Sequence, residues 1–312
     1  MSLVLLGVAG ALLVAPAVAG RWGRRLPPRD RAALTATALG GGALALETGL
    51  LTLAAPTVLR ALGWSGLAHA CERTFRLLLP GGPIVGWLAV AGAVGVAAGA
   101  AQGALRALRL HRRARIEPWL GQHHPRNDFE LVILPMAEPV AYSLGGRHPQ
   151  VVLSVGLADA LTPRQRAAVL RHEASHLRHR HQRTLVAASA LDHAVGLVPG
   201  VRAGTASLRN ALERWADEDA SGRTRGSRSC LRSALLASAH VLAAPQTAAF
   251  GGLEALAERA DALRRPAPSA SVVARTLAWG GLATAGMVGL VALGLWVGEV
   301  RSVLAMAGYC VS

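Results

Sequence analysis

Two histidines stand four residues apart in the stretch "VLRHEASHLRHRHQ", and a glutamate follows the first of them. On a helix, residues at i and i+4 share a face, so His172 and His176 can direct their imidazole nitrogens at one metal ion. Glu173 can then reach a water molecule held by that ion, as in zinc hydrolases. The alternative is a solvated basic helix, and we expect His179 and His181 to lie on the surface.

A catalytic zinc ion needs a third protein ligand and an open fourth position. The stretch "LERWADEDA" offers Glu213 and, one helical turn later, Asp217. We predict that Glu213 binds Zn²⁺, while Asp217 accepts a hydrogen bond from the second nitrogen of a ligand imidazole. Glu218 and Asp219 are expected to balance nearby arginines. The alternative is that the whole stretch is an acidic patch that balances nearby arginines.

The HExxH residues must lie on a helix, and the sequence contains a start signal for one. Thr162 is a suitable N-cap, Pro163 suits the first helical position, and Gln165 completes a capping box. Upstream, "FELVILP" predicts a strand and "EPVAYSLGGRHPQVVLSVGLADAL" a hairpin, after a turn-rich linker "PWLGQHHPRND". The second hairpin strand could offer an edge to an extended peptide. Downstream, the apolar "TLVAASALDHAVGLVPG" predicts a helix packed within the domain or against a membrane.

The composition favours a membrane protein over a nucleic-acid-binding protein. The 312 residues are 52% hydrophobic, with 33 basic and 18 acidic side chains and a formal net charge of +15. Every basic residue other than histidine is arginine. The three cysteines are far apart, so neither a disulfide framework nor a cysteine zinc site is indicated. The arginines cluster beside apolar stretches, which explains the charge without direct nucleic-acid binding.

Four stretches are long and apolar enough to span a bilayer, which takes about 20 residues. They are Ser2–Gly20, about 32–59, Ile84–Leu105 and Thr276–Val297. Glu47 is the only charge within the second stretch. A charge at membrane depth is expensive, so Glu47 is either a functional residue or pairs with a neighbouring helix.

The arginines predict the orientation of these spans. The loop after the first span and the segment after the third hold five arginines each, which places both in the cytoplasm. Both termini then lie outside it, in a multi-pass protein of the cell membrane. The predicted regions are three N-terminal spans in 1–105, a cytoplasmic domain in 106–265, a linker in 266–275, a fourth span in 276–298 and a short tail in 299–312.

The order "HEASH" then "ERWAD" resembles the gluzincin pattern HExxH…ExxxD of integral-membrane metallopeptidases. Within that group the chain is most similar to the M56 family of the BlaR1/MecR1 type, and next to the M48 Ste24/HtpX group. The resemblance implies His172, His176 and Glu213 as zinc ligands, Glu173 as catalytic base and Asp217 as a supporting residue. It departs from the M56 pattern after the fourth span, where no room remains for an extracellular penicillin-binding domain.

The sequence therefore predicts a mostly α integral membrane protein with four transmembrane helices and a cytoplasmic α+β zincin-like domain. The predicted activity is that of a zinc metalloendopeptidase. The resemblance implies that its partners are the lipid bilayer and a cytoplasmic protein substrate, such as a BlaI/MecI-type transcriptional repressor. The alternatives are a non-catalytic membrane scaffold that retains the zinc motif and a membrane-anchored binder of nucleic acid or anionic lipid.

Overall fold

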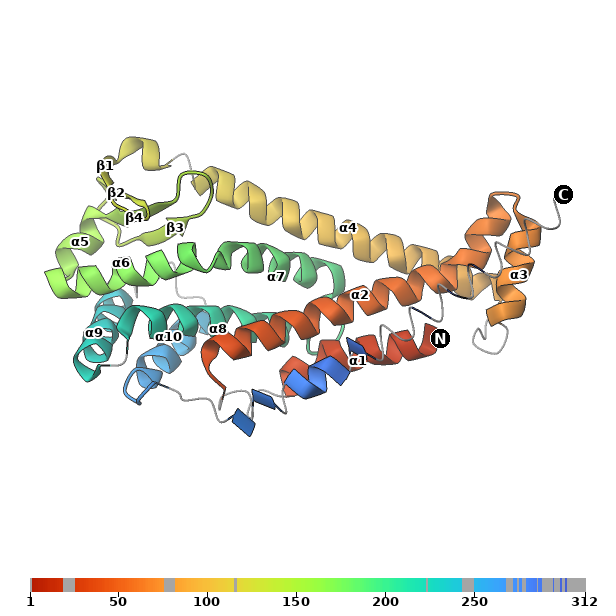
Figure 1. Ribbon diagram of the computed structural model, residues 1–312. Coiled ribbons are helices and arrows are strands. Elements are labelled where there is room, and N and C mark those ends of the chain that lie inside the picture. The colour runs from red at the N-terminus through yellow and green to blue at the C-terminus, as the bar shows by residue number, and fades with distance from the viewer. Residues whose placement is uncertain are drawn as a thin grey trace.

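The computed structural model describes residues 2–18, 26–75, 82–114, 117–222, 224–242 and 250–267, and scattered residues between 272 and 301. Within these ranges the chain is mostly helical, with one small sheet (Figure 1). The sheet and the helices that surround it lie at one end of an elongated molecule, and two long helices extend from them toward the other end.

Among the described residues, two helices are long and apolar enough to cross a membrane: α2 (Pro28–Ala61) and α4 (Gly82–Ala114). The first predicted span corresponds to α1 (Ser2–Val18), a helix of 17 residues that packs along α2. A short helix, α3 (Ser65–Phe75), follows α2. The fourth predicted span, 276–297, lies largely outside the described residues.

Glu47 lies on α2, where its side chain is half-buried. Its Oε2 atom is buried and has no hydrogen-bond partner among the described residues.

The sheet has four short strands in the order β1-β2-β4-β3, namely β1 (Gln122–Pro125), β2 (Glu130–Leu134), β3 (Ala141–Leu144) and β4 (Gln150–Ser154). The predicted strand and hairpin are confirmed as β2 and the antiparallel pair β3–β4. The prediction of a linker at β1 was wrong, because β1 pairs with β2 although all four of its residues are exposed. The predicted free edge was also misplaced. β4 lies between β2 and β3, so β3 is the edge strand on that side.

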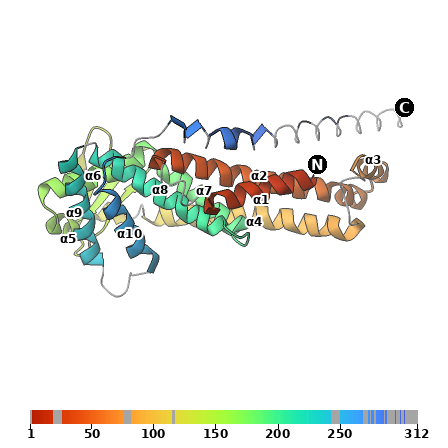
Figure 2. The same cartoon turned by 90° about the horizontal axis from the view of Figure 1, so that it is seen from below.

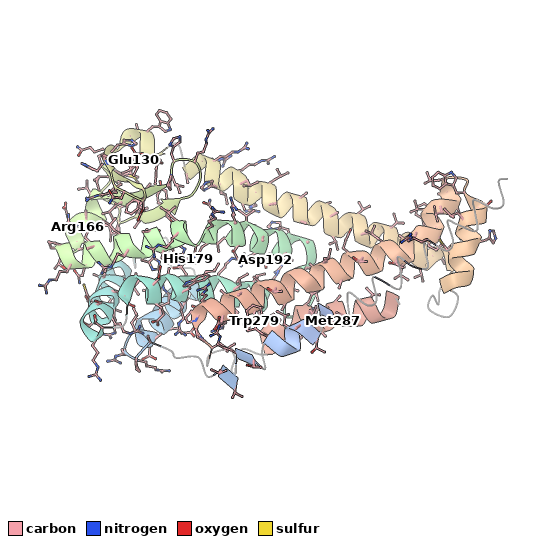
Figure 3. All side chains as sticks on the ribbon, viewed as in Figure 1. Glu130, Arg166, His179, Asp192, Trp279 and Met287 are labelled. Carbon is pink, nitrogen blue, oxygen red and sulfur yellow. The ribbon has the colours of Figure 1, made fainter. Side chains whose placement is uncertain are left out.

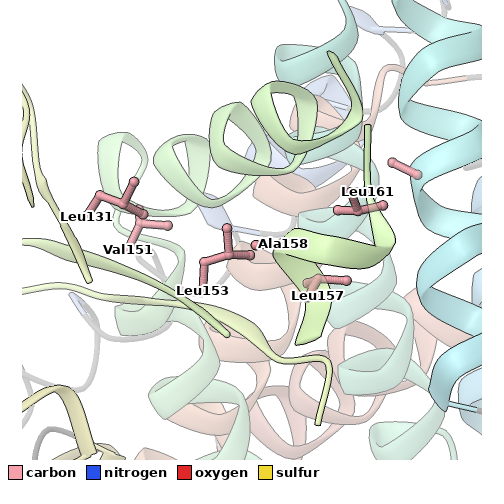
Figure 4. Packing of buried hydrophobic residues seen from close by; sticks show 7 residues of the cluster. Leu131, Val151, Leu153, Leu157, Ala158 and Leu161 are labelled. Carbon is pink, nitrogen blue, oxygen red and sulfur yellow. The ribbon is translucent and has the colours of Figure 1, made fainter. Parts of the chain in front are cut away.

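One face of the sheet supports the helix that carries the HExxH residues. Side chains alternate between the two faces of a strand, so Leu131, Val151 and Leu153 share one side. They pack with residues of α5 (Val155–Ala160) and with apolar side chains of α6 (Pro163–Arg178) (Figure 4). The buried contact anchors α6 through its apolar face and leaves its other face for the histidines.

The capping box predicted at the start of α6 is confirmed. The Thr162 hydroxyl accepts a hydrogen bond from the backbone N–H of Gln165, and the Gln165 side chain accepts one from the backbone N–H of Thr162. Pro163 occupies the first turn, where its missing N–H costs nothing. These contacts fix the residue at which the helix begins.

After α6, the chain forms a helical hairpin of α7 (His181–Val195) and α8 (Val201–Ser221), which runs beside α2 and α4 (Figures 1 and 2). The predicted packed helix in this segment is thus confirmed. The contact with α4 is close. A Cβ atom at Gly99 would lie 2.6 Å from the His193 carbonyl oxygen, and one at Gly103 would lie 2.5 Å from that of Ser189. Glycine is required at both positions because a side chain would collide with backbone.

The hairpin also has a polar contact between its two helices. Asp192 of α7, labelled in Figure 3, accepts hydrogen bonds from the Thr205 hydroxyl and from the Arg209 guanidinium of α8. The chain continues through α9 (Arg225–Leu242) to α10 (Phe250–Ala262), which packs against α8 and α9.

Candidate metal centre

The two histidines of the HExxH stretch point at the same place. His172 and His176 lie one turn apart on α6, and their Nε2 atoms are 3.1 Å apart. The His172 side chain is 9% exposed and that of His176 is 12% exposed. Two buried ring nitrogens directed at one point need either a shared proton or a cation between them.

A carboxylate from α8 completes the cluster. Glu213 places Oε2 at 3.4 Å from the Nε2 atom of His172 and Oε1 at 3.5 Å from the Nε2 atom of His176. Donor atoms around a tetrahedral zinc ion with bonds of about 2.0–2.2 Å are separated by about 3.3–3.6 Å. Each histidine nitrogen lies at such a distance from its nearest Glu213 oxygen, and the three residues together form a group whose donor atoms could hold a zinc ion.

Asp217 lies behind the cluster rather than in it. Its Oδ1 atom is 3.0 Å from the Nδ1 atom of His172, on the side of the ring away from Nε2, and the residue is only 2% exposed. Glu213 and Asp217 share a face of α8 at the i, i+4 spacing. One turn of α8 thus supplies both the carboxylate that faces the candidate metal position and the one that lies against the Nδ1 atom of a candidate ligand imidazole.

Arg259 is the residue of the site that the sequence did not indicate. It comes from α10, and its guanidinium donates two hydrogen bonds of 2.8 Å to the two carboxylate oxygens of Asp217. Another of its nitrogens lies 3.0 Å from the Oε2 atom of Glu213. The stretch "LEALAERADALRR" predicts a helix, but it contains no spacing or motif that links Arg259 to residues of α8.

The charges of the cluster stabilise one another. Burial opposes protonation of His172, but hydrogen bonds to Asp217 and Glu213 outweigh it and raise the His172 pKa to about 10. Burial would raise the pKa of Glu213, yet His172 and Arg259 hold it well below its usual range. His172 is therefore protonated in the metal-free protein, and zinc has to displace that proton, because a ligand imidazole must be neutral.

Glu173 occupies the position next to His172 on α6, where its side chain is half-buried. It makes no hydrogen bond or ion pair within the described part of the chain. Its negative charge lies close enough to add to the other charges that raise the pKa of His172. The Glu173 carboxylate thus lies beside the cluster, where it can interact with a molecule bound there.

The two remaining acidic residues of the predicted stretch hold helices together, as expected for balancing charges. Glu218 pairs with Arg228 of α9, and that arginine is 3% exposed. Asp219 pairs with Arg178, at 2.7 Å, and with His179, at the end of α6.

His181 does not lie on the surface, so that prediction was wrong. It is 1% exposed, and its Nδ1 atom lies 3.0 Å from the Nδ1 atom of His176. The Trp215 ring of α8 covers it, with ring centroids 4.8 Å apart. The charged string "HLRHRH" is typical of a solvated surface, and it contains no signal that His181 is buried.

Comparison with known protein families supports a metal site at this cluster. A model of peptidase family M48 matches residues 106–258, which include all three candidate ligands. The match supports a metallopeptidase of the M48 kind and gives no support to the M56 subtype that the sequence resembles. A search of curated proteins returned no match. A search of solved structures returned none either.

Proposed function

We propose that this chain is a membrane-held zinc metalloendopeptidase, with His172, His176 and Glu213 as its metal ligands. The observation that carries the proposal is the convergence of two histidine nitrogens from α6 and one carboxylate from α8, close enough together to hold one zinc ion. The match to peptidase family M48 supports the same chemistry.

The residues around the cluster have defined tasks in peptide hydrolysis. When bound, zinc lowers the pKa of a water molecule and polarises the scissile carbonyl group. Glu173 accepts the proton of the attacking water and donates it to the leaving amine. Asp217 holds His172 through Nδ1 and keeps the Nε2 atom directed at the metal position.

Replacing Glu173 with glutamine tests the assignment of the base. The variant is expected to bind zinc with unchanged stoichiometry and to lose cleavage of fluorescein-labelled casein by a factor of about 100 or more, because the base is removed while every ligand stays. Glu138→Gln is the matched control, since Glu138 is exposed and outside the cluster. Near-normal turnover of Glu173→Gln would exclude Glu173 as the base.

The membrane location is part of the proposal and rests on α2, α4 and the arginine clusters that flank the apolar stretches. It places the zinc centre in the cytoplasm, with four spans and both termini outside. A reporter enzyme fused after Arg115 is expected to report a cytoplasmic location, and one fused at Ser312 an external one. The reverse pattern would place the zinc centre outside the cytoplasm.

The substrate proposal is narrower and rests on the M56 resemblance alone. The substrate is a cytoplasmic protein, such as a repressor of the BlaI/MecI type, that is cleaved in response to a signal. Incubating purified protein with a candidate repressor tests this, and an intact repressor beside cleaved casein would rule that repressor out while leaving the peptidase activity in place.

A further inference from the structure

His181 packs directly behind His176, on the side of the ring that faces away from the candidate metal position. The Nε2 atom of His176 points toward His172 and Glu213, while its Nδ1 atom faces the Nδ1 atom of His181 at 3.0 Å. The two rings meet edge to face, with centroids 4.9 Å apart. The contact is closed to solvent, because His181 is 1% exposed.

The backbone adopts a strained turn that places His181 there. α6 ends at Arg178 and α7 begins at His181, only three positions later. Between them, Arg180 has a φ of 54° and a ψ of 38°, and it is the sole non-glycine residue with positive φ among the described residues. A non-glycine side chain in this left-handed region is unfavourable, so the surrounding contacts must compensate for it.

The contact determines which nitrogen of each ring carries a proton. For Nε2 of His176 to offer a lone pair to a metal ion, the neutral ring must carry its proton on Nδ1. That Nδ1–H group then donates to the nitrogen opposite, which is Nδ1 of His181. His181 must in turn be neutral and carry its own proton on Nε2.

The surroundings of His181 keep it neutral. The His181 ring is closed off from solvent, and the Trp215 ring covers it with centroids 4.8 Å apart, so a charged ring would lose its hydration there. Its Nε2 atom is buried without a hydrogen-bond partner among the described residues, so no hydrogen bond at that atom stabilises a charged ring. A neutral imidazole with an unshared pair on Nδ1 is the acceptor that His176 requires.

We propose that His181 is a positioning residue, which holds His176 in the Nδ1-protonated tautomer and so directs the Nε2 lone pair at the metal position. The inference rests on the proposed zinc site. The two histidine ligands then have different supports: His172 is held by the carboxylate of Asp217, and His176 by a neutral ring.

Variants with asparagine or glutamine at position 181 distinguish the role of His181 as a hydrogen-bond acceptor from a role in packing alone. The Oδ1 atom of asparagine stands as far from the backbone as Nδ1 of histidine, so His181→Asn keeps an acceptor for His176. His181→Gln moves its oxygen one carbon further out, and His181→Phe keeps the ring against Trp215 but has no acceptor. His179→Phe is the control, because His179 packs on Trp215 and on the His181 ring, whereas the nitrogen contact to His176 comes from His181.

Zinc affinity of the detergent-solubilised full chain, measured by competition with a chelator, is the first readout. His181→Phe and His181→Gln are expected to weaken zinc binding by about 10- to 100-fold, the range typical of lost support behind a ligand. His181→Asn and His179→Phe are expected to stay within a few-fold of the wild type. If His181→Phe binds zinc as tightly as the wild type, or if His181→Asn binds as weakly as His181→Gln, the proposal is overturned.

The second readout does not require zinc binding. Chemical shifts of ¹⁵N-labelled histidines in the metal-free protein report which nitrogen of His176 is protonated. Nδ1 is expected in the wild type and in His181→Asn, and Nε2 is expected to take a share in His181→Phe. A wild type protonated on Nε2 overturns the role of His181. A wild type protonated on Nδ1 that binds no zinc overturns only the zinc site.

Discussion

Replacing Arg259 with alanine is expected to lower the free energy of unfolding of the metal-free protein by about 3–5 kcal/mol. The guanidinium makes two hydrogen bonds to Asp217, which is 2% exposed, and contacts Glu213. Without it, the buried carboxylate of Asp217 loses two hydrogen bonds and keeps only the His172 ring as a charged neighbour. Denaturant titration of the detergent-solubilised chain measures the loss.

Arg265→Ala is the matched control for this prediction. Arg265 also forms an arginine–aspartate contact of 2.8 Å, with Asp261, but its side chain is 76% exposed. A surface pair of this kind contributes about 0–1 kcal/mol, so the control should be close to the wild type. Zinc is expected to recover part of the stability lost in Arg259→Ala, since a cation again faces Glu213. Equal losses of unfolding free energy in the two variants would mean that the buried contact of Arg259 stabilises the protein no more than the exposed contact of Arg265.

Zinc binding is expected to respond in three different ways to alanine at Glu213, Asp217 and Glu218. Glu213→Ala should abolish tight binding, because it removes the one carboxylate whose oxygens face both histidine Nε2 atoms. Asp217→Ala should weaken binding by about 10- to 100-fold, because it removes the carboxylate behind His172 and leaves all three candidate ligands in place.

Glu218→Ala is the informative third variant in this series. It should leave zinc affinity unchanged but lower the unfolding free energy, because Arg228 would be left buried without its carboxylate. Zinc affinity and denaturant stability should be measured on all three proteins. A severe zinc defect in Glu218→Ala would show that the ligand assignment on α8 is wrong.

Local signals in the sequence were sufficient to predict the elements that carry the site. The capping box fixed the start of α6, and the i, i+4 spacing placed His172 with His176 and Glu213 with Asp217. These are contacts within one helix turn, which a sequence pattern records directly. The strand β2 and the pair β3–β4 were predictable for the same reason, because apolar runs were separated by turn residues.

Contacts between distant parts of the chain were not predictable in this way. Arg259 reaches the site through the packing of α10, and nothing near it in the sequence records that packing. His181 was assigned to the surface because its neighbours are charged, whereas the turn at Arg180 and the ring of Trp215 bury it. β1 was missed because all of its side chains are exposed, so it lacks the alternation that predicts a strand.

Arg259 lies on α10, so it is synthesised after every other residue of the candidate site. Arg259 follows His172 by 87 positions. Ribosomes add about 5–20 residues per second, so the histidine is synthesised roughly 4–17 s before the arginine. In the later part of that interval, after Asp217 has been added, the nascent chain lacks the cation that holds Glu213 and Asp217 in place. A peptidase built in this order is expected to become competent only late in translation, after the helices that carry its histidines have left the ribosome.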